Sequence, residues 1–108
     1  MEWHENLYAG ESIRHKLQKV KWKVAHNAGQ LRVYVITLAS NEKNLLDIIP
    51  ARELLQKYYP KRDLYVVGLA GNYKEAVELA GHIVSDVYRK TGGFDVRFHL
   101  RQKGKRDT

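Results

Sequence analysis

Two short and almost continuously apolar runs constrain the fold of this chain most strongly. Residues 31–38 read LRVYVITL and residues 64–69 read LYVVGL, and both are rich in β-branched and aromatic side chains. Such runs are typical of strands that are covered on both faces, as in parallel sheets. They predict the centre of a sheet with helices packed against it.

A third run, FDVRFHL at residues 94–100, alternates apolar and polar side chains. This alternation predicts a strand at the edge of the sheet, or one with a solvated face. Together the runs predict an α/β fold: a small three-stranded, mainly parallel sheet with flanking helices in the order αβαβαβ, similar to half of a Rossmann or flavodoxin fold. The strand orders 2-1-3 and 1-2-3 both fit this pattern.

Helical patterns lie between the apolar runs. Pro50 suits the first position of a helix over residues 51–59, which Pro60 would end. A longer helix is predicted over residues 73–90, where apolar side chains recur at helical spacing and Gly92-Gly93 follows as a left-handed end.

The segment at residues 12–28 has two interpretations. Its apolar side chains recur at helical spacing over four turns, and Ser12 can cap a helix there. The alternation VKWKV at residues 20–24 would instead place an N-terminal β-hairpin before the first apolar run. We favour the helix because the alternation covers only five residues.

The length of 108 residues fits one domain, which we expect over residues 1–100, with residues 1–11 as a flexible lead-in and residues 101–108 as a disordered basic tail. The absence of cysteine excludes disulfides and thiolate metal sites. No signal peptide is recognisable, and no apolar run approaches the ~20 residues of a membrane span. We therefore expect a cytoplasmic protein that does not contact membranes.

The net charge is +7, but it falls to +4 without residues 101–108, which hold four basic residues and one acidic residue. A charge of this size is mildly basic. Any binding of nucleic acid is therefore expected to be weak and independent of sequence.

The turn LAGNYKE at residues 69–75 joins an apolar run to a helix, which is where phosphate-binding loops occur. Neither the GxxxxGK[ST] nor the GxGxxG pattern is present. Asn72 and Glu75 have the spacing of a capping box, which predicts a helix start, and Gly71 suits the tight turn before it. We expect a structural turn, with an anion at the helix N-terminus as the alternative.

A polar crevice is a second candidate site. Open parallel sheets bind ligands beyond the carboxyl ends of their strands, so the loop at residues 39–44 would lie beside the turn at residues 70–74. The candidate ligand-binding residues for a small anion or nucleotide are Ser40, Asn41, Asn44, Gly71, Asn72 and Tyr73. The same residue types are also ordinary turn and cap formers.

Trp22 is a third candidate. On a helix over residues 12–28 it points away from the apolar stripe and lies on the side of His15, Lys19 and His26. An aromatic ring among cations can stack on nucleic-acid bases, with Lys16, Lys19, Lys23 and the basic tail as phosphate contacts, or it can anchor a protein interface. In the hairpin alternative, Trp22 would face the core.

No motif predicts catalysis. The histidines show no HExxH spacing and Ser40 lacks a GxSxG context, so we expect no catalytic residue, metal site or cofactor. The leading hypothesis is a non-enzymatic binding or adaptor module that contacts a protein partner, or a second copy, through the Trp22 face or the edge of the third strand. The alternatives are a small-ligand or nucleotide-binding domain and a weak nucleic-acid-binding protein.

Three stretches, VYVITLASNEKNLLDI, LYVVGLAGNYKEA and VYRKTGGFDVR, resemble a group of small bacterial α/β proteins without an assigned activity. The resemblance covers about residues 30–100. It implies a compact domain, and no functional residue is carried over from it.

Overall fold

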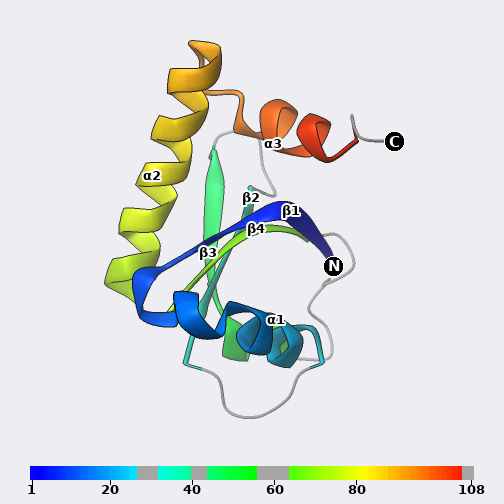
Figure 1. Cartoon of the computed structure of the whole chain (residues 1–108), viewed down its shortest axis with the longest axis vertical. Coiled ribbons are helices and arrows are strands. Elements are labelled where there is room, and N and C mark those ends of the chain that lie inside the picture. Colours follow the sequence, from blue (N-terminus) through cyan, green and yellow to red (C-terminus); the bar gives the residue numbers. More distant parts are fainter. Residues whose placement is uncertain (27–31, 40–43, 56–63, 106–108) are drawn as a thin grey trace.

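The computed structural model describes residues 1–26, 32–39, 44–55 and 64–105, and it shows a four-stranded sheet with helices on both faces (Figure 1). The strands are β1 (Glu2–Ala9), β2 (Tyr34–Leu38), β3 (Leu46–Pro50) and β4 (Tyr65–Ala70), in the spatial order β1-β4-β2-β3. β4 runs parallel to β1 but antiparallel to β2, and β2 is antiparallel to β3. The predicted α/β class is confirmed, whereas the predicted three-stranded, mainly parallel sheet is wrong.

Each face of the sheet carries its own hydrophobic cluster. On one face lie the 3₁₀ helix η1 (Glu11–Lys16), helix α1 (Leu17–Ala25) and the 3₁₀ helix η2 (Ala51–Leu55), which pack on Val35, Val66 and Leu69. On the other face lie α2 (Tyr73–Thr91) and α3 (Val96–Lys105), which pack on Ile36 and Val67. All six residues of β4 are buried, so the apolar run there predicted a central strand correctly.

The lead-in predicted at residues 1–11 contains an edge strand. The β1 backbone joins β4 through hydrogen bonds from Glu2 N to Leu64 O and from Gly10 N to Leu69 O, both 2.8 Å. Its sequence lacks a clean alternation because the buried position at His4 is polar, and the His4 ring bonds the Tyr65 hydroxyl at 3.2 Å. The pairing also shifts register between Trp3 and Tyr8, which breaks the two-residue period further.

The second unpredicted strand, β3, ends at the residue that we expected to start a helix. Pro50 pairs with Tyr34 at the end of an edge strand, where the missing N–H of proline costs no ladder hydrogen bond. The predicted helix at residues 51–59 is a 3₁₀ helix over Ala51–Leu55, and residues 56–63 lie outside the described part of the chain.

The third strand, predicted at residues 94–100, is absent, because residues 96–100 form the first part of α3. Val96 and Leu100 are buried four residues apart on one helix face, while Phe98 is 64% exposed. In this short run, the alternation of apolar and polar residues also places two apolar residues four positions apart, which is a helical spacing. The Asp95 carboxylate accepts a hydrogen bond from Phe98 N at 3.1 Å, a capping contact that favours the helix. Because α3 continues to Lys105, the predicted tail begins inside a helix.

The remaining helical predictions are confirmed. Of the helix predicted over residues 12–28, the first part is the 3₁₀ helix η1, the second is α1, and residues 27–28 lie outside the described part of the chain. The hairpin alternative is wrong. Helix α2 begins after the N-cap Asn72 and ends at Gly92, whose φ of 79° is the left-handed conformation that glycine adopts without strain. Among the helices described, none is long and apolar enough to cross a membrane.

Candidate functional site

The predicted polar crevice is divided between two ends of the sheet. Because β2 and β4 are antiparallel, Ala70 pairs with Tyr34 at the start of β2, whereas the loop after β2 leaves from Leu38 at its other end. Asn44 therefore lies at the end of the sheet opposite to Gly71, Asn72 and Tyr73. Ser40 and Asn41 lie outside the described residues. Among the described residues, Asn44 therefore does not share a site with the Gly71 turn.

The turn at Gly71 holds an anion that belongs to the chain itself. The Glu75 carboxylate accepts hydrogen bonds from Gly71 N at 2.6 Å, from Ser12 N at 3.1 Å and from Ser12 Oγ at 2.8 Å. Partial burial favours the neutral acid, but these hydrogen bonds outweigh it and hold the pKa of Glu75 below its ordinary value. A Cβ on Gly10 would overlap this carboxylate, so a larger residue there would displace the Glu75 side chain from its hydrogen bonds.

The capping prediction at the same turn is confirmed. The Asn72 side chain accepts a hydrogen bond from Glu75 N at 2.9 Å. Tyr73, the third residue predicted here, packs edge-on against Tyr34 with ring centroids 5.7 Å apart. The polar groups of Gly71 and Asn72 are thus used in building the start of α2.

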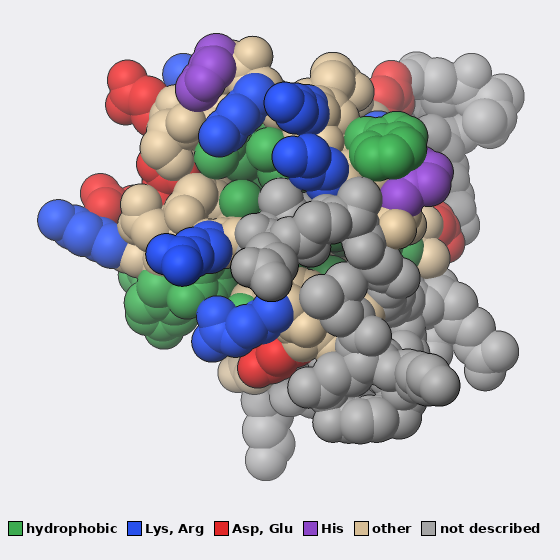
Figure 2. All heavy atoms as spheres, turned by 90° about the horizontal axis from the view of Figure 1, so that it is seen from below, with side chains coloured by type: hydrophobic (Ala, Val, Ile, Leu, Met, Phe, Trp, Pro, Cys, Tyr) green, Lys and Arg blue, Asp and Glu red, His purple; other side chains and the backbone are tan. Residues whose placement is uncertain are grey.

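A pocket of about 430 Å³ lies between the η1–α1 segment and the segment that enters β2. Seen from below, Lys and Arg side chains gather around hydrophobic side chains on this face (Figure 2). Polar and apolar residues from four segments line the pocket: Ser12, Ile13, Lys16, Lys19, Val20, Lys23, Arg32, Val33 and Gly71.

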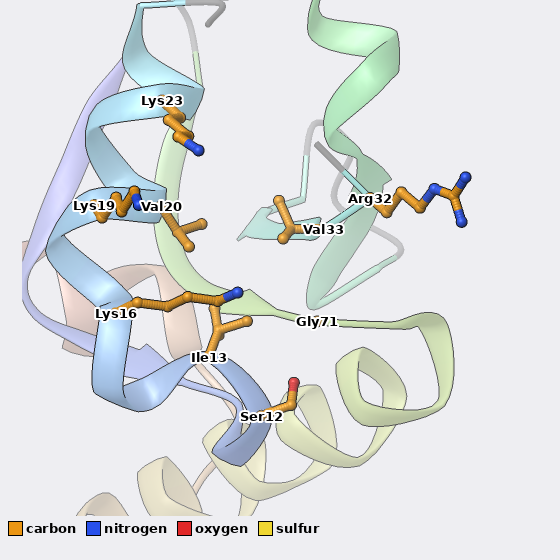
Figure 3. Close-up of a pocket in the computed structure, with 9 residues that line it drawn as sticks. All are labelled: Ser12, Ile13, Lys16, Lys19, Val20, Lys23, Arg32, Val33 and Gly71. Carbon is orange, nitrogen blue, oxygen red and sulfur yellow. The ribbon is translucent and has the colours of Figure 1, made fainter. Parts of the chain in front are cut away.

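The helix period explains why three lysines line one pocket. Lys16, Lys19 and Lys23 are three and four residues apart and lie together beside the buried Val20. The side chains of Lys16 and Lys23 extend from this segment toward Val33, and Arg32 projects outward on the far side (Figure 3).

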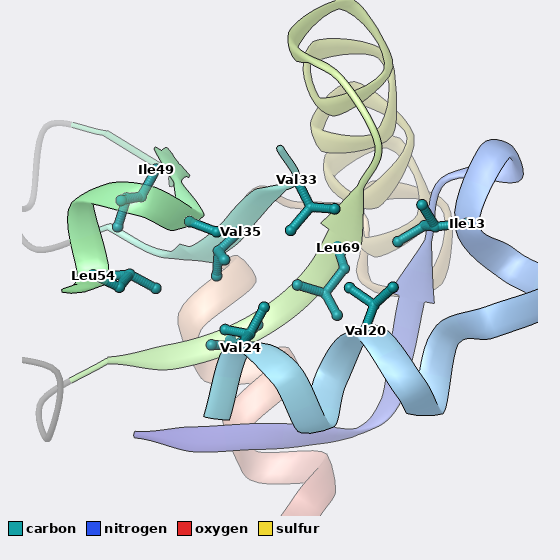
Figure 4. Packing of buried hydrophobic residues seen from close by; sticks show 10 residues of the cluster. Ile13, Val20, Val24, Val33, Val35, Ile49, Leu54 and Leu69 are labelled. Carbon is teal, nitrogen blue, oxygen red and sulfur yellow. The ribbon is translucent and has the colours of Figure 1, made fainter. Parts of the chain in front are cut away.

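The floor of the pocket is apolar and rigidly held. Ile13, Val20 and Val33 are 3%, 4% and 8% exposed, and they converge with Leu69 in one hydrophobic cluster (Figure 4). The floor is buried, whereas Lys16, Lys19 and Arg32 are exposed to solvent, so the cations form the rim of the pocket.

The pocket carries an excess of positive charge. Within the described part of the chain, the ion pairs involve Arg89, Lys90 and Arg101, and none involves the four pocket cations. One carboxylate, that of Glu75, approaches the rim, and it is engaged by Ser12 and Gly71. The three lysines and Arg32 that line the pocket therefore have no carboxylate partner among the described residues.

Trp22 lies beside the pocket lysines on the exposed side of α1. Its side chain is 56% exposed, and the His26 ring stacks on it with centroids 4.3 Å apart and planes 21° apart. The His26 Nδ1 donates to the Trp22 carbonyl at 2.8 Å, which fixes the stack. On the same helix, the Lys21 ammonium lies over the Trp3 ring, 5.4 Å from its centroid. The fourth predicted interface residue, His15, is exposed on η1.

Arg32 and Val33 were not predicted as site residues. They approach α1 only because the start of β2 lies beside the end of β4, which depends on the unpredicted antiparallel pairing. No local motif marks either residue. Among the residues that the structure describes, no group of three or more His, Asp or Glu side chains could hold a metal ion.

Searches of protein-family models, curated proteins and solved structures found no match to this chain. The resemblance to small bacterial α/β proteins therefore stays a prediction, and functional inference rests on the pocket itself.

Proposed function

We propose that this protein is a binding protein whose basic pocket, formed by Lys16, Lys19, Lys23 and Arg32, takes a phosphate-bearing anion. The observation that carries the proposal is that three lysines at helical spacing line one pocket with an apolar floor, with Arg32 at its far side and no ion-pair partner for any of the four among the described residues. The pocket volume of about 430 Å³ lies within the ordinary range of small-molecule sites.

Stability does not account for this arrangement. Like charges at helical spacings of three and four repel one another and cost a few tenths of a kcal/mol per pair. An anion in the pocket would relieve the repulsion and gain charge-assisted hydrogen bonds from the ammonium groups. The geometry is thus unfavourable in the free protein and favourable in a complex, which supports a role in binding.

Calorimetric titration with inorganic tripolyphosphate tests the proposal. We expect saturable binding that weakens about tenfold in Lys19→Gln, because one charge-assisted contact is lost. Lys21→Gln is the matched control, since Lys21 lies on the same helix but contacts Trp3. Equal weakening in both variants would mean that only the net charge matters, and an absence of binding would refute the proposal.

A second candidate function is contact with a protein partner or another copy of this chain. The exposed Trp22 favours it, because buried aromatic anchors dominate many interfaces. The predicted third-strand edge does not contribute, since residues 96–105 form α3. Sedimentation over a wide range of protein concentration tests self-association, which Trp22→Ala should then weaken.

A further inference from the structure

We infer that the anion is single-stranded nucleic acid, whose phosphates follow the lysines of the η1–α1 segment while a base stacks on Trp22. This inference rests on the proposed function, because it assigns a ligand class to the same basic pocket. It adds the Trp22–His26 pair to the site as a stacking platform.

The position of Trp22 places an aromatic surface directly beside the phosphate contacts. Lys19 and Trp22 are three residues apart, and Lys23 and His26 are also three apart, so each aromatic side chain neighbours a lysine on the helix surface. Figure 2 shows an exposed hydrophobic side chain beside a histidine at the margin of the basic face. Cations and an aromatic ring on one continuous surface are what proteins use to bind unpaired strands.

The Trp22 ring is also prepared for stacking before a ligand arrives. His26 covers part of the indole at 4.3 Å and is itself tied to the helix backbone, yet the Trp22 side chain remains 56% exposed. A ring held in this way loses little conformational entropy when a base packs on it. A base would extend the existing Trp22–His26 stack.

The lysines extend further than a single phosphate needs. Seven residues separate Lys16 from Lys23, which corresponds to about 10 Å along a helix. Charges recur every 3.4 Å or so along each strand of a duplex, so a track of this length faces more than one phosphate. The track therefore suits a nucleotide chain better than an isolated phosphate. An unpaired strand is required because bases in a duplex do not expose a face for stacking.

The test compares two polyanions on the full chain in a Trp3→Phe background, where Trp22 is the only tryptophan. The probes are an oligothymidylate of about eight nucleotides and an inorganic polyphosphate of similar charge. We expect the oligothymidylate to quench Trp22 fluorescence and to bind more tightly than polyphosphate. A duplex of the same length should not quench Trp22.

Variants separate stacking from charge, with binding followed by the anisotropy of a labelled oligothymidylate and by its competition with polyphosphate. Trp22→Ala should weaken oligothymidylate binding about tenfold and leave polyphosphate binding unchanged, whereas Trp22→Phe should restore most of the affinity. Lys19→Gln should weaken both ligands. With the three lysines engaged, the log–log salt slope for the oligothymidylate should be about −2.1.

The possible failures are distinguishable. Equal affinity for both polyanions, with Trp22→Ala leaving each unchanged, would overturn the nucleic-acid inference but retain the anion pocket. An absence of binding by either polyanion would overturn both proposals. Self-association that depends on Trp22, with oligothymidylate binding unaffected by Trp22→Ala, would overturn the inference in favour of a protein contact.

Discussion

The Gly71 turn and the η1–α1 pocket are both built to receive negative charge, but only the turn contains its own anion. At the turn, the Glu75 carboxylate occupies the donors of Gly71 and Ser12. The pocket is lined by three lysines and Arg32 over an apolar floor, and none of the four has an ion-pair partner among the described residues. The difference supports a structural role for the glycine-rich turn and the proposed binding role for the pocket, although the turn has the more motif-like sequence.

The largest expected effect comes from forcing the Glu75 carboxylate out of its site. A Cβ at Gly10 would overlap that carboxylate, so Gly10→Ala should lower the free energy of unfolding by about 2–3 kcal/mol. Gly93→Ala is the control, since nothing lies within 4 Å of the added Cβ. Urea unfolding compares the two, and equal stability in both variants would show that the carboxylate can leave the turn freely.

Removing the charge should cost less than displacing the side chain. Glu75→Gln should lower the free energy of unfolding by about 1–2 kcal/mol at pH 7, because hydrogen bonds to a charged acceptor are weakened. The exposed Glu78 on the same helix provides the control, Glu78→Gln, which should be nearly neutral.

The same variant carries a pH test whose sign follows from the lowered pKa of Glu75. A lowered pKa in the folded state contributes stability above the unfolded pKa of 4.5, and that contribution is lost as the pH falls through the folded value. The difference between wild type and Glu75→Gln should therefore shrink on acidification from pH 7. A difference that grew instead would contradict the assignment.

The N-cap residue of α2, Asn72, should contribute less to the free energy of unfolding than Glu75 does. Asn72→Ala should lower the free energy of unfolding by about 1 kcal/mol, whereas Asn72→Gly should cost only a few tenths. Thermal or urea unfolding measures both. An unchanged midpoint in the alanine variant would remove the capping role and return Asn72 to the list of binding candidates.

Substitutions of the pocket lysines are expected to have the smallest effect on stability. This sharpens the comparison between the pocket and the Gly71 turn. Lys19→Gln should change the free energy of unfolding by no more than a few tenths of a kcal/mol, because removing one of several like charges does not remove a native ion pair. Lys23→Gln, at the next position of the pocket, should behave in the same way. A loss above about 1 kcal/mol in either variant would show that the lysine is structural.

Much of the fold could be predicted from local patterns. The two central strands follow from apolar runs, the helix at residues 11–25 from its spacing, and α2 from Asn72 and Gly92. The strand β1 and the helix α3 could not be predicted, because their patterns are ambiguous. The polar His4 interrupts the apolar alternation of β1, and the four-residue spacing of Val96 and Leu100 fits a strand and a helix equally. Local sequence predicts elements well where burial is complete.

The relative orientation of β2 and β4 was predicted wrongly because the strand β3 was not predicted. The β2–β3 hairpin reverses the chain, so β4 returns antiparallel to β2, and this separates the predicted crevice into two ends. The pocket was only half predicted for the same reason. The helical spacing of Lys16, Lys19 and Lys23 was visible in the sequence. Arg32 reaches the pocket only because β2 pairs with β4, which is distant in the sequence.

The most direct test of the distinction between turn and pocket is an amide chemical-shift map of the full chain during titration with tripolyphosphate. Ser12 and Gly71 border both sites, so the discriminating amides are those of Lys19, Lys23 and Arg32 for the pocket, and Asn72 and Glu75 for the turn. We predict saturable shifts at the three pocket residues, with the two turn residues unchanged. Shifts centred on Asn72 and Glu75, with Lys19, Lys23 and Arg32 unmoved, would contradict the account.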